Sequence, residues 1–347
     1  MRRRPSPLVL PSPRPPAAAG DRSALSVSAV SGPCRAPSRR RGRAGAAAAV
    51  LLVPVLLAGC SGSKDVQVSV KGALGARPQV TFPKKTSPEK DLAVKTLAGG
   101  KGPAARKGDL VVADYVGYRW NKSGSKMLAS TYLAGKPQAF STGTLVPGLD
   151  KALDGAKAGA RIVARIPPKE AYGDEGDSSH QVEAGDSLVY VLDVRAVYAK
   201  TAAARGARSA PTAPGLPQVG SPDAGTAPPV TIPKAAPPKT LRTSVLIKGT
   251  GAAVRTDQLV ALQYTGVFWR NGRTFDSSWR TGRPAAVTIG DGQVIQGWVK
   301  GLVGQAVGSR VLLVVPPSMG YGAKGLAQAG IKGTDTLVFV VDILGAH

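Results

Sequence analysis

The stretch Leu97-Ala98-Gly99-Gly100-Lys101-Gly102 returns about 149 positions later as Leu246-Ile247-Lys248-Gly249-Thr250-Gly251. The same shift places Ala171-Tyr172-Gly173 on Gly320-Tyr321-Gly322. A register held over about a hundred residues is typical of an internal repeat and does not arise by chance. The chain therefore contains two copies of one domain, each about 120 residues long.

Apolar, β-branched runs dominate each copy. In the second copy they cover residues 258–264, 309–315 and 337–343 and predict three strands. Asn271-Gly272 indicates a hairpin turn before the next strand. One helix is expected from Ile295 to about Val303, where apolar residues recur at helical spacing. The fold class is therefore α+β, with an antiparallel twisted sheet wrapped on one short α-helix in each copy.

The composition excludes several classes of protein. The chain has 347 residues, a net charge of +25, two Cys and two His. So few cysteines exclude a disulfide-stapled scaffold and a cysteine-rich zinc fold, and we expect no cofactor and no metal. The basic residues after position 60 are scattered without aromatic interleaving, so we expect no nucleic-acid partner. Anionic lipid headgroups or wall polymers are a better match for this charge.

The N-terminal region has the pattern of an export signal. The basic run Arg39-Arg40-Arg41-Gly42-Arg43 precedes fifteen uncharged residues, Ala44 to Ala58. At about 1.5 Å per residue this segment is short for a membrane-spanning helix, and it fits a secretory signal peptide. The ending Leu57-Ala58-Gly59-Cys60 resembles the lipobox of bacterial lipoproteins, which implies lipid attachment at Cys60. We expect an exported protein, lipid-anchored on the outer face of the cell membrane; the alternative is a plain signal peptide with an incidental cysteine.

Five motifs follow one another in the second copy: Tyr264-Thr265-Gly266, Phe275-Asp276-Ser277-Ser278, Val294-Ile295-Gln296-Gly297-Trp298, Tyr321-Gly322 and Thr336-Leu337-Val338-Phe339. This ordered series resembles the FKBP-type peptidyl-prolyl cis–trans isomerases over residues 241–347. The resemblance implies two tandem FKBP-like domains and rotation of X–Pro bonds. It also implies proline-containing unfolded or exported polypeptides as substrates and macrolide inhibitors as ligands.

The resemblance also assigns roles to single residues. Trp298 would form the floor beneath the proline ring, the backbone N–H of Ile295 would receive a substrate carbonyl, and Tyr321 would donate a hydrogen bond. Asp276 would face the twisted carbonyl. The catalytic set implied is Tyr264, Phe275, Asp276, Ile295, Trp298 and Tyr321, with Val294, Ile331 and Phe339 as substrate-binding walls.

The first copy retains the fold pattern but changes the site. By sequence register, Met127 replaces the Phe, Leu128 the Asp, Leu149 the Trp and Tyr190 the last Phe. A smaller floor and a missing carboxylate predict weak or absent isomerase activity with retained peptide binding.

The expected domain organisation follows from these segments. It comprises residues 1–60 as a disordered leader with a lipoprotein signal peptide, 61–77 as a tether and first strand, 78–200 as a degenerate FKBP-like domain, 201–227 as a Pro/Ala/Gly-rich linker, and 228–347 as the isomerase domain. The linker composition predicts an extended spacer without packed side chains. The function expected is isomerisation of X–Pro bonds in exported proteins, assisting their folding. The alternative is a non-enzymatic peptide-binding chaperone or a surface adhesion module.

Overall fold

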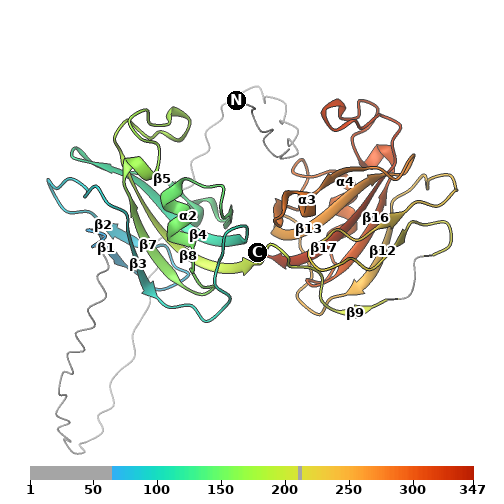
Figure 1. The fold of residues 1–347 in the computed structure, drawn as a ribbon, viewed down its shortest axis with the longest axis horizontal. Helices are drawn as coiled ribbons and strands as arrows, with labels where there is room; N and C mark the ends of the chain where they lie inside the picture. The colour runs from blue at the N-terminus through green and yellow to red at the C-terminus, as the bar shows by residue number, and fades with distance from the viewer. Residues whose placement is uncertain (1–64, 210–212) are drawn as a thin grey trace, which may run out of the picture. The chain divides into compact units, whose positions relative to one another are not determined.

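The computed structural model describes residues 65–209 and 213–347, which form two α+β domains (Figure 1). The expected leader, the signal peptide and Cys60 lie outside the described residues. Within the described ranges, no helix is long and apolar enough to cross a membrane. The fold class expected from the sequence is confirmed in both domains.

The second domain is a mostly antiparallel sheet that carries short helices. Neighbouring strands follow the order β14-β13-β17-β16-β12-β9, and β15 pairs with β13. Its strands are β9 (Ala207–Arg208), β12 (Arg242–Lys248), β13 (Leu259–Phe268), β14 (Thr274–Ser277), β15 (Ala285–Thr288), β16 (Arg310–Val315) and β17 (Leu337–Ala346), and its α-helices are α3 (Ser278–Thr281) and α4 (Gln296–Leu302). The three strands and the Asn271-Gly272 hairpin predicted from the sequence are therefore present.

Helix α4 packs closely on strand β16 because two glycines face the sheet. A Cβ added at Gly297 would lie 2.5 Å from Val315, and one added at Gly301 would lie 2.5 Å from Leu313. Trp298 and Leu302 on the same helix are buried in the core. The absence of side chains at the two glycines thus sets how deeply α4 and its Trp298 sit against the sheet.

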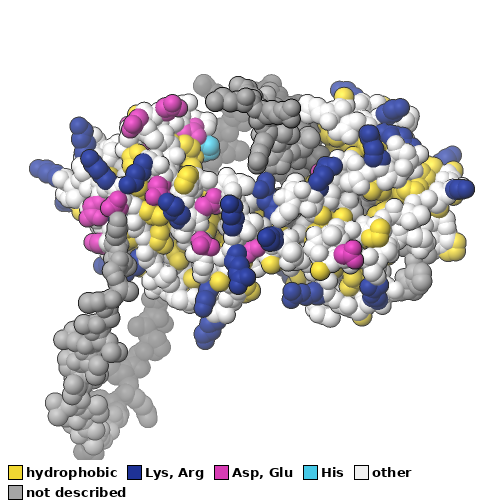
Figure 2. All heavy atoms as spheres, in the orientation of Figure 1, with side chains coloured by type: hydrophobic (Ala, Val, Ile, Leu, Met, Phe, Trp, Pro, Cys, Tyr) yellow, Lys and Arg dark blue, Asp and Glu magenta, His cyan; other side chains and the backbone are white. Residues whose placement is uncertain are grey.

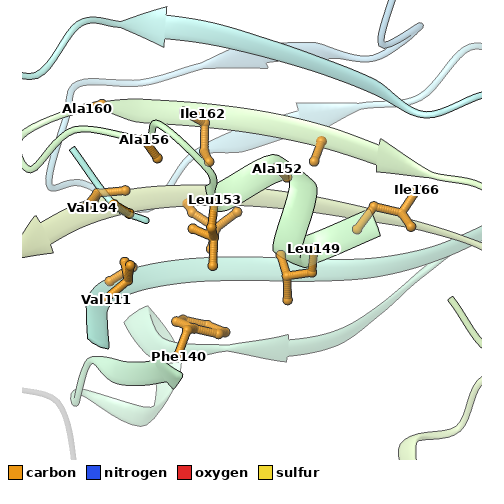
Figure 3. Packing of buried hydrophobic residues seen from close by; sticks show 14 of the residues in the cluster. Val111, Phe140, Leu149, Ala152, Leu153, Ala156, Ala160, Ile162, Ile166 and Val194 are labelled. Carbon is orange, nitrogen blue, oxygen red and sulfur yellow. The ribbon is translucent and has the colours of Figure 1, made fainter. Parts of the chain in front are cut away.

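The first domain repeats this arrangement with the order β3-β7-β8-β4-β5, and β6 pairs with β4. Leu149 and Leu153 project from helix α2 (Pro147–Leu153) toward Phe140 and Val111 in the core of this domain (Figure 3). Its strands are β3 (Ala93–Ala98), β4 (Leu110–Asn121), β5 (Gly124–Ser130), β6 (Gln138–Ser141), β7 (Arg161–Ile166) and β8 (Ser187–Tyr198), and its α-helices are α1 (Thr131–Ala134) and α2 (Pro147–Leu153).

A small β-hairpin precedes each domain and packs on the sheet face opposite the helix. In the first domain β1 (Ser69–Lys71) pairs with β2 (Gln79–Thr81), and Val70 and Val80 pack against the cluster around Trp120. In the second, β10 (Gln218–Val219) pairs with β11 (Val230–Thr231). Because both sheet faces are covered, β13 and β16 are buried along almost their whole length rather than at alternate residues.

This packing corrects the expectation of an extended spacer at residues 201–227. Leu216 and Val219 contact a buried cluster that includes Trp269, and β9 extends the sheet beside β12. The amide of Ala204 also donates to the buried Asp342 carboxylate. Residues 201–227 contain few large apolar side chains, which is why the composition predicted no packing. The few that are present are buried against an apolar sheet face that other segments of the domain form.

The hairpin of the second domain is expected to contribute measurably to stability. Val219→Asp places a carboxylate in the half-buried contact with the Trp269 cluster, which we expect to cost about 2 kcal/mol. Gln218→Asp, at the exposed neighbouring position of the same strand, is the matched control and is expected to cost less than about 0.5 kcal/mol. Thermal unfolding of the two full-length variants measures the difference; equal melting temperatures would contradict the packing role.

Candidate active site

An aromatic cluster forms the centre of the candidate site in the second domain. The ring of Trp298 lies 5.4 Å from those of Tyr264 and Phe339, each in an edge-on arrangement. Phe275 stands edge-on to Phe339 at 5.6 Å. Trp298 is only 3% exposed, and its indole Nε1 has no hydrogen-bond partner among the described residues. The cluster is therefore a rigid apolar surface with one hydrogen-bond donor, the indole Nε1, that has no partner among the described residues.

The remaining predicted wall residues join the same cluster. Ile331 is buried, whereas Val294, Ile295 and Tyr321 are half-buried and pack against it. All nine residues predicted from the sequence are thus gathered in one region, with Asp276 reaching it through Tyr264. Their individual catalytic roles remain predictions.

Gly266 allows the aromatic rings to approach strand β13. An added Cβ would lie 2.6 Å from Phe275, closer than real Cβ atoms come, and would also crowd Phe339 at 3.0 Å. The sequence pattern included this glycine in a motif but gave it no role. Its role is steric, because it leaves the space that two of the aromatic walls occupy.

The carboxylate of Asp276 is held at the edge of the aromatic cluster. The hydroxyl of Tyr264 donates to its Oδ2, and the amide of Ser277 donates to Oδ1 at 2.8 Å. Burial, reinforced by the negative charge of Asp276, raises the pKa of Tyr264 well above its usual range. Tyr264 therefore stays protonated and fixes the orientation of the carboxylate.

Ile295 offers a free backbone donor beside the aromatic floor. This residue caps α4 in an extended conformation, and its carbonyl accepts from the amide of Trp298 at 2.9 Å. Its own N–H has no acceptor within residues 65–209 and 213–347. The amides that start a helix lack partners within it, so this one can bind a substrate carbonyl. The helix begins at Gln296, one residue later than the periodicity predicted.

The Tyr321 hydroxyl is expected to remain a hydrogen-bond donor over the whole working pH range. Burial, followed by the charge of Asp276, raises the pKa of Tyr321 to about 12. We therefore expect kcat/KM to be flat from about pH 6 to pH 9, measured by NMR exchange on a prolyl peptide. Because the pKa of Tyr321 is raised in the folded state, the contribution of this residue to the free energy of unfolding is complete below about pH 10 and is lost toward pH 12. A fall in rate with a midpoint below pH 9 that Tyr321→Phe abolishes would contradict this assignment.

Two supporting residues were missed by the sequence reasoning. The hydroxyl of Ser278 accepts the amide of Tyr264 at 2.8 Å and donates to Gln263 at 2.6 Å, which ties the Asp276 segment to β13. Arg280 donates to the carbonyl of Phe275 at 3.3 Å and lies 4.0 Å from the Asp276 carboxylate. The signal for both was their position directly after Asp276, where the chain forms the short helix α3, which was not predicted from the sequence.

The equivalent region of the first domain lacks the carboxylate and the indole. Strand pairing places Ala129 opposite Gly117 as Asp276 lies opposite Gly266, so Ala129, not Leu128, occupies the Asp position. This corrects the register by one residue; Leu128, not Met127, then takes the Phe275 position. The hydroxyl of Tyr115, the counterpart of Tyr264, donates instead to Gln138 at 3.2 Å.

The floor of the first domain is also different. Leu149 stands at the Trp298 position and is 5% exposed, so it fills the core without an aromatic surface. Tyr190 replaces Phe339 and packs at 5.8 Å from Tyr115. The first domain therefore keeps an apolar, aromatic-lined region without the polar group of the second.

Fold and site together define a pair of small antiparallel-sheet domains, one of which presents an aromatic floor, a free backbone donor and a fixed carboxylate. A family model described as FKBP-type peptidyl-prolyl cis-trans isomerase matches residues 102–195 and 251–344. The chain belongs to this family, as the resemblance predicted.

Several relatives match over about the length of one domain. The FK506-binding protein of Streptomyces anulatus is 37% identical over 117 residues, which is 34% of this chain and 94% of that protein. The probable FK506-binding protein of Corynebacterium glutamicum is 35% identical over 119 residues, covering 34% of this chain and 98% of that protein. Among solved structures, FkpA from Escherichia coli is 28% identical, covers 33% of this chain and 51% of its own, and has a TM-score of 0.29.

Proposed function

We infer that the second domain catalyses cis–trans rotation of X–Pro bonds in exported polypeptides and that the first domain binds such segments with little or no catalysis. One difference between the domains supports this division of labour. The second domain has Trp298 and Asp276 where the first has Leu149 and Ala129. Catalysis of X–Pro rotation follows from membership of the family; the division of labour and the exported clients are the proposal.

The chemistry required is modest. Rotation about an X–Pro bond faces a barrier of about 20 kcal/mol, because the resonance of the amide is lost when it twists. An enzyme lowers this barrier by binding the twisted amide better than either planar form. No bond is made or broken, so the residues act by binding and orientation alone.

The residues of the second domain can supply this differential binding. The proline ring would rest on Trp298, with Phe275 and Phe339 as side walls. The free N–H of Ile295 would hold a neighbouring substrate carbonyl and so fix one side of the rotating bond. An apolar environment favours the twisted amide, whose carbonyl has lost resonance and is less polar.

We also propose that the chain is exported and lipid-anchored through Cys60 at the outer face of the membrane. The support is the basic run, the uncharged segment and the Leu57-Ala58-Gly59-Cys60 ending. Only five residues separate Cys60 from Val66, which is buried against the first domain, so the anchor would keep this domain near the membrane surface. Mass spectrometry of the purified mature chain tests cleavage and acylation; an intact N-terminus overturns this proposal.

One experiment tests the division of labour in the full chain. Asp276→Ala with Trp298→Leu gives the second domain the residues of the first at both positions. We expect kcat/KM on a prolyl peptide to fall at least tenfold, with the remainder attributable to the first domain. Activity above half that of the natural chain would place catalysis in the first domain. A natural chain no faster than the uncatalysed reaction would favour the non-enzymatic peptide-binding chaperone or adhesion module.

A further inference from the structure

The loop that carries part of the site has opposite charge in the two domains. In the second domain this loop runs from β16 to β17 and holds Tyr321 and Ile331, both packed in the aromatic cluster. Shifting by the repeat period places Glu175 on Lys324 and Glu183 on Lys332. In Figure 2, acidic side chains gather on the loop of the first domain and basic ones on the loop of the second. Charge reversal at both matched positions is a difference between two otherwise similar sites.

The basic residues of the second loop are available to a ligand. Lys324 and Lys332 are exposed, and neither ammonium group has an ion-pair or hydrogen-bond partner among the described residues. In the first domain, by contrast, Glu183 pairs with Arg119 at 2.7 Å. The loop acid Asp335 is buried and already neutralised by Arg270 at 2.8 Å. Leu326 and Ile331 form a β-bridge that closes the loop, so the two lysines flank the segment that contributes Ile331 to the site.

A third cation lies beside Asp276. Arg280 on α3 is exposed, and its counterpart in the first domain is the uncharged Leu133. Asp276 itself is engaged by Tyr264 and lies beside Arg280. A polypeptide bound at the aromatic floor therefore meets cations on the loop that contributes Ile331 and beside Asp276.

We propose that the second domain selects prolyl segments that carry acidic side chains next to the X–Pro unit. This inference deepens the proposed function and rests on it. Unpaired cations around a binding site raise the local concentration of acidic ligands and stabilise them once bound. The first domain, whose matched loop is acidic, does not share this preference, so the two domains do not compete for the same segments.

The preference is measured with peptides that differ only in charge. A series with Glu, Gln or Lys on either side of one X–Pro unit is given to the full chain, and kcat/KM is measured at low and high salt. We expect the Glu peptide to be favoured over the Lys peptide by about three- to tenfold at low salt. The preference is expected to nearly vanish at about 1 M salt, where the screening length is about 3 Å.

Two charge-reversal variants decide where the preference comes from. Lys324→Glu with Lys332→Glu is expected to invert the order of the peptides. Arg242→Glu with Lys248→Glu makes the same change in net charge on β12, which carries no site residue, and is expected to leave the order unchanged.

The possible failures are distinguishable. Catalysis without a charge preference, or a preference that survives reversal of the loop lysines, overturns this inference and leaves the proposed function intact. Absence of catalysis with every peptide overturns the proposed function itself.

Discussion

Trp298→Leu is expected to lower kcat/KM of the full chain by about ten- to a hundredfold while leaving the second domain folded. The indole is the floor of the aromatic cluster, and leucine removes the flat ring on which the proline would rest. The expected fold-change corresponds to about 1.4 to 2.7 kcal/mol of transition-state stabilisation. Leucine is compatible with the fold, because Leu149 occupies the matched position of the first domain and is 5% exposed there. Trp298→Leu therefore tests the role of the indole in the site while the hydrophobic core stays filled.

Trp269→Leu is the matched control for this variant. Trp269 is 6% exposed and packs on the opposite face of the same sheet, where it donates to the carbonyl of Ala235 at 3.0 Å. We expect a lower melting temperature with kcat/KM within about twofold of the natural chain. Equal losses of activity in the two tryptophan variants would show that Trp298 acts through stability rather than as the floor.

Arg161→Met is expected to destabilise the first domain by about 3–5 kcal/mol. The guanidinium and the Asp193 carboxylate are both almost fully buried and meet at 2.5 Å. Arg161 also donates to the carbonyls of Gly72 and Ala76, which fasten the turn of the preceding hairpin. Removing the cation leaves a buried carboxylate without its charge partner and loosens the hairpin.

Hydrogen exchange localises this effect within the two-domain chain. Amides of β7 and β8 are expected to exchange at least about a hundredfold faster in Arg161→Met, whereas those of β16 and β17 keep their rates. The control is Lys151→Met, which breaks the exposed pair with Glu170 at 2.9 Å and is expected to cost less than about 1 kcal/mol. Unchanged exchange in β7 and β8 would mean that the buried pair contributes nothing net to stability.

Much of the fold was predictable because its signals are local. The runs at residues 309–315 and 337–343 became β16 and β17 within one to three residues, and the apolar stripe from Ile295 became α4. Repetition strengthened these predictions, since the same pattern had to satisfy two copies of one sheet. The nine site residues could be named because an ordered set of motifs is far more specific than any single residue.

The two errors have a common physical cause. The hairpin formed by β10 and β11 was not expected, because its few apolar side chains are buried only by a sheet face assembled from distant segments. The register of the first copy was misjudged by one residue because its β4–β5 hairpin is longer: Ala129 follows its partner Gly117 by 12 residues, whereas Asp276 follows Gly266 by 10. A longer hairpin shifts which residues pair, and a sequence comparison without pairing information does not show where the extra residues lie.

The sequence by itself determined the repeat, the α+β class, the family and the residue types of the site, since each depends on spacing along the chain. Only the tertiary structure decided which residues meet: the covering of both sheet faces, the place of Ala129 opposite Gly117, and the packing in the aromatic cluster of Ile331, whose loop also carries Lys324 and Lys332. Strand pairing joins residues far apart in the sequence, and its register is set by packing across the whole sheet, which no local pattern contains.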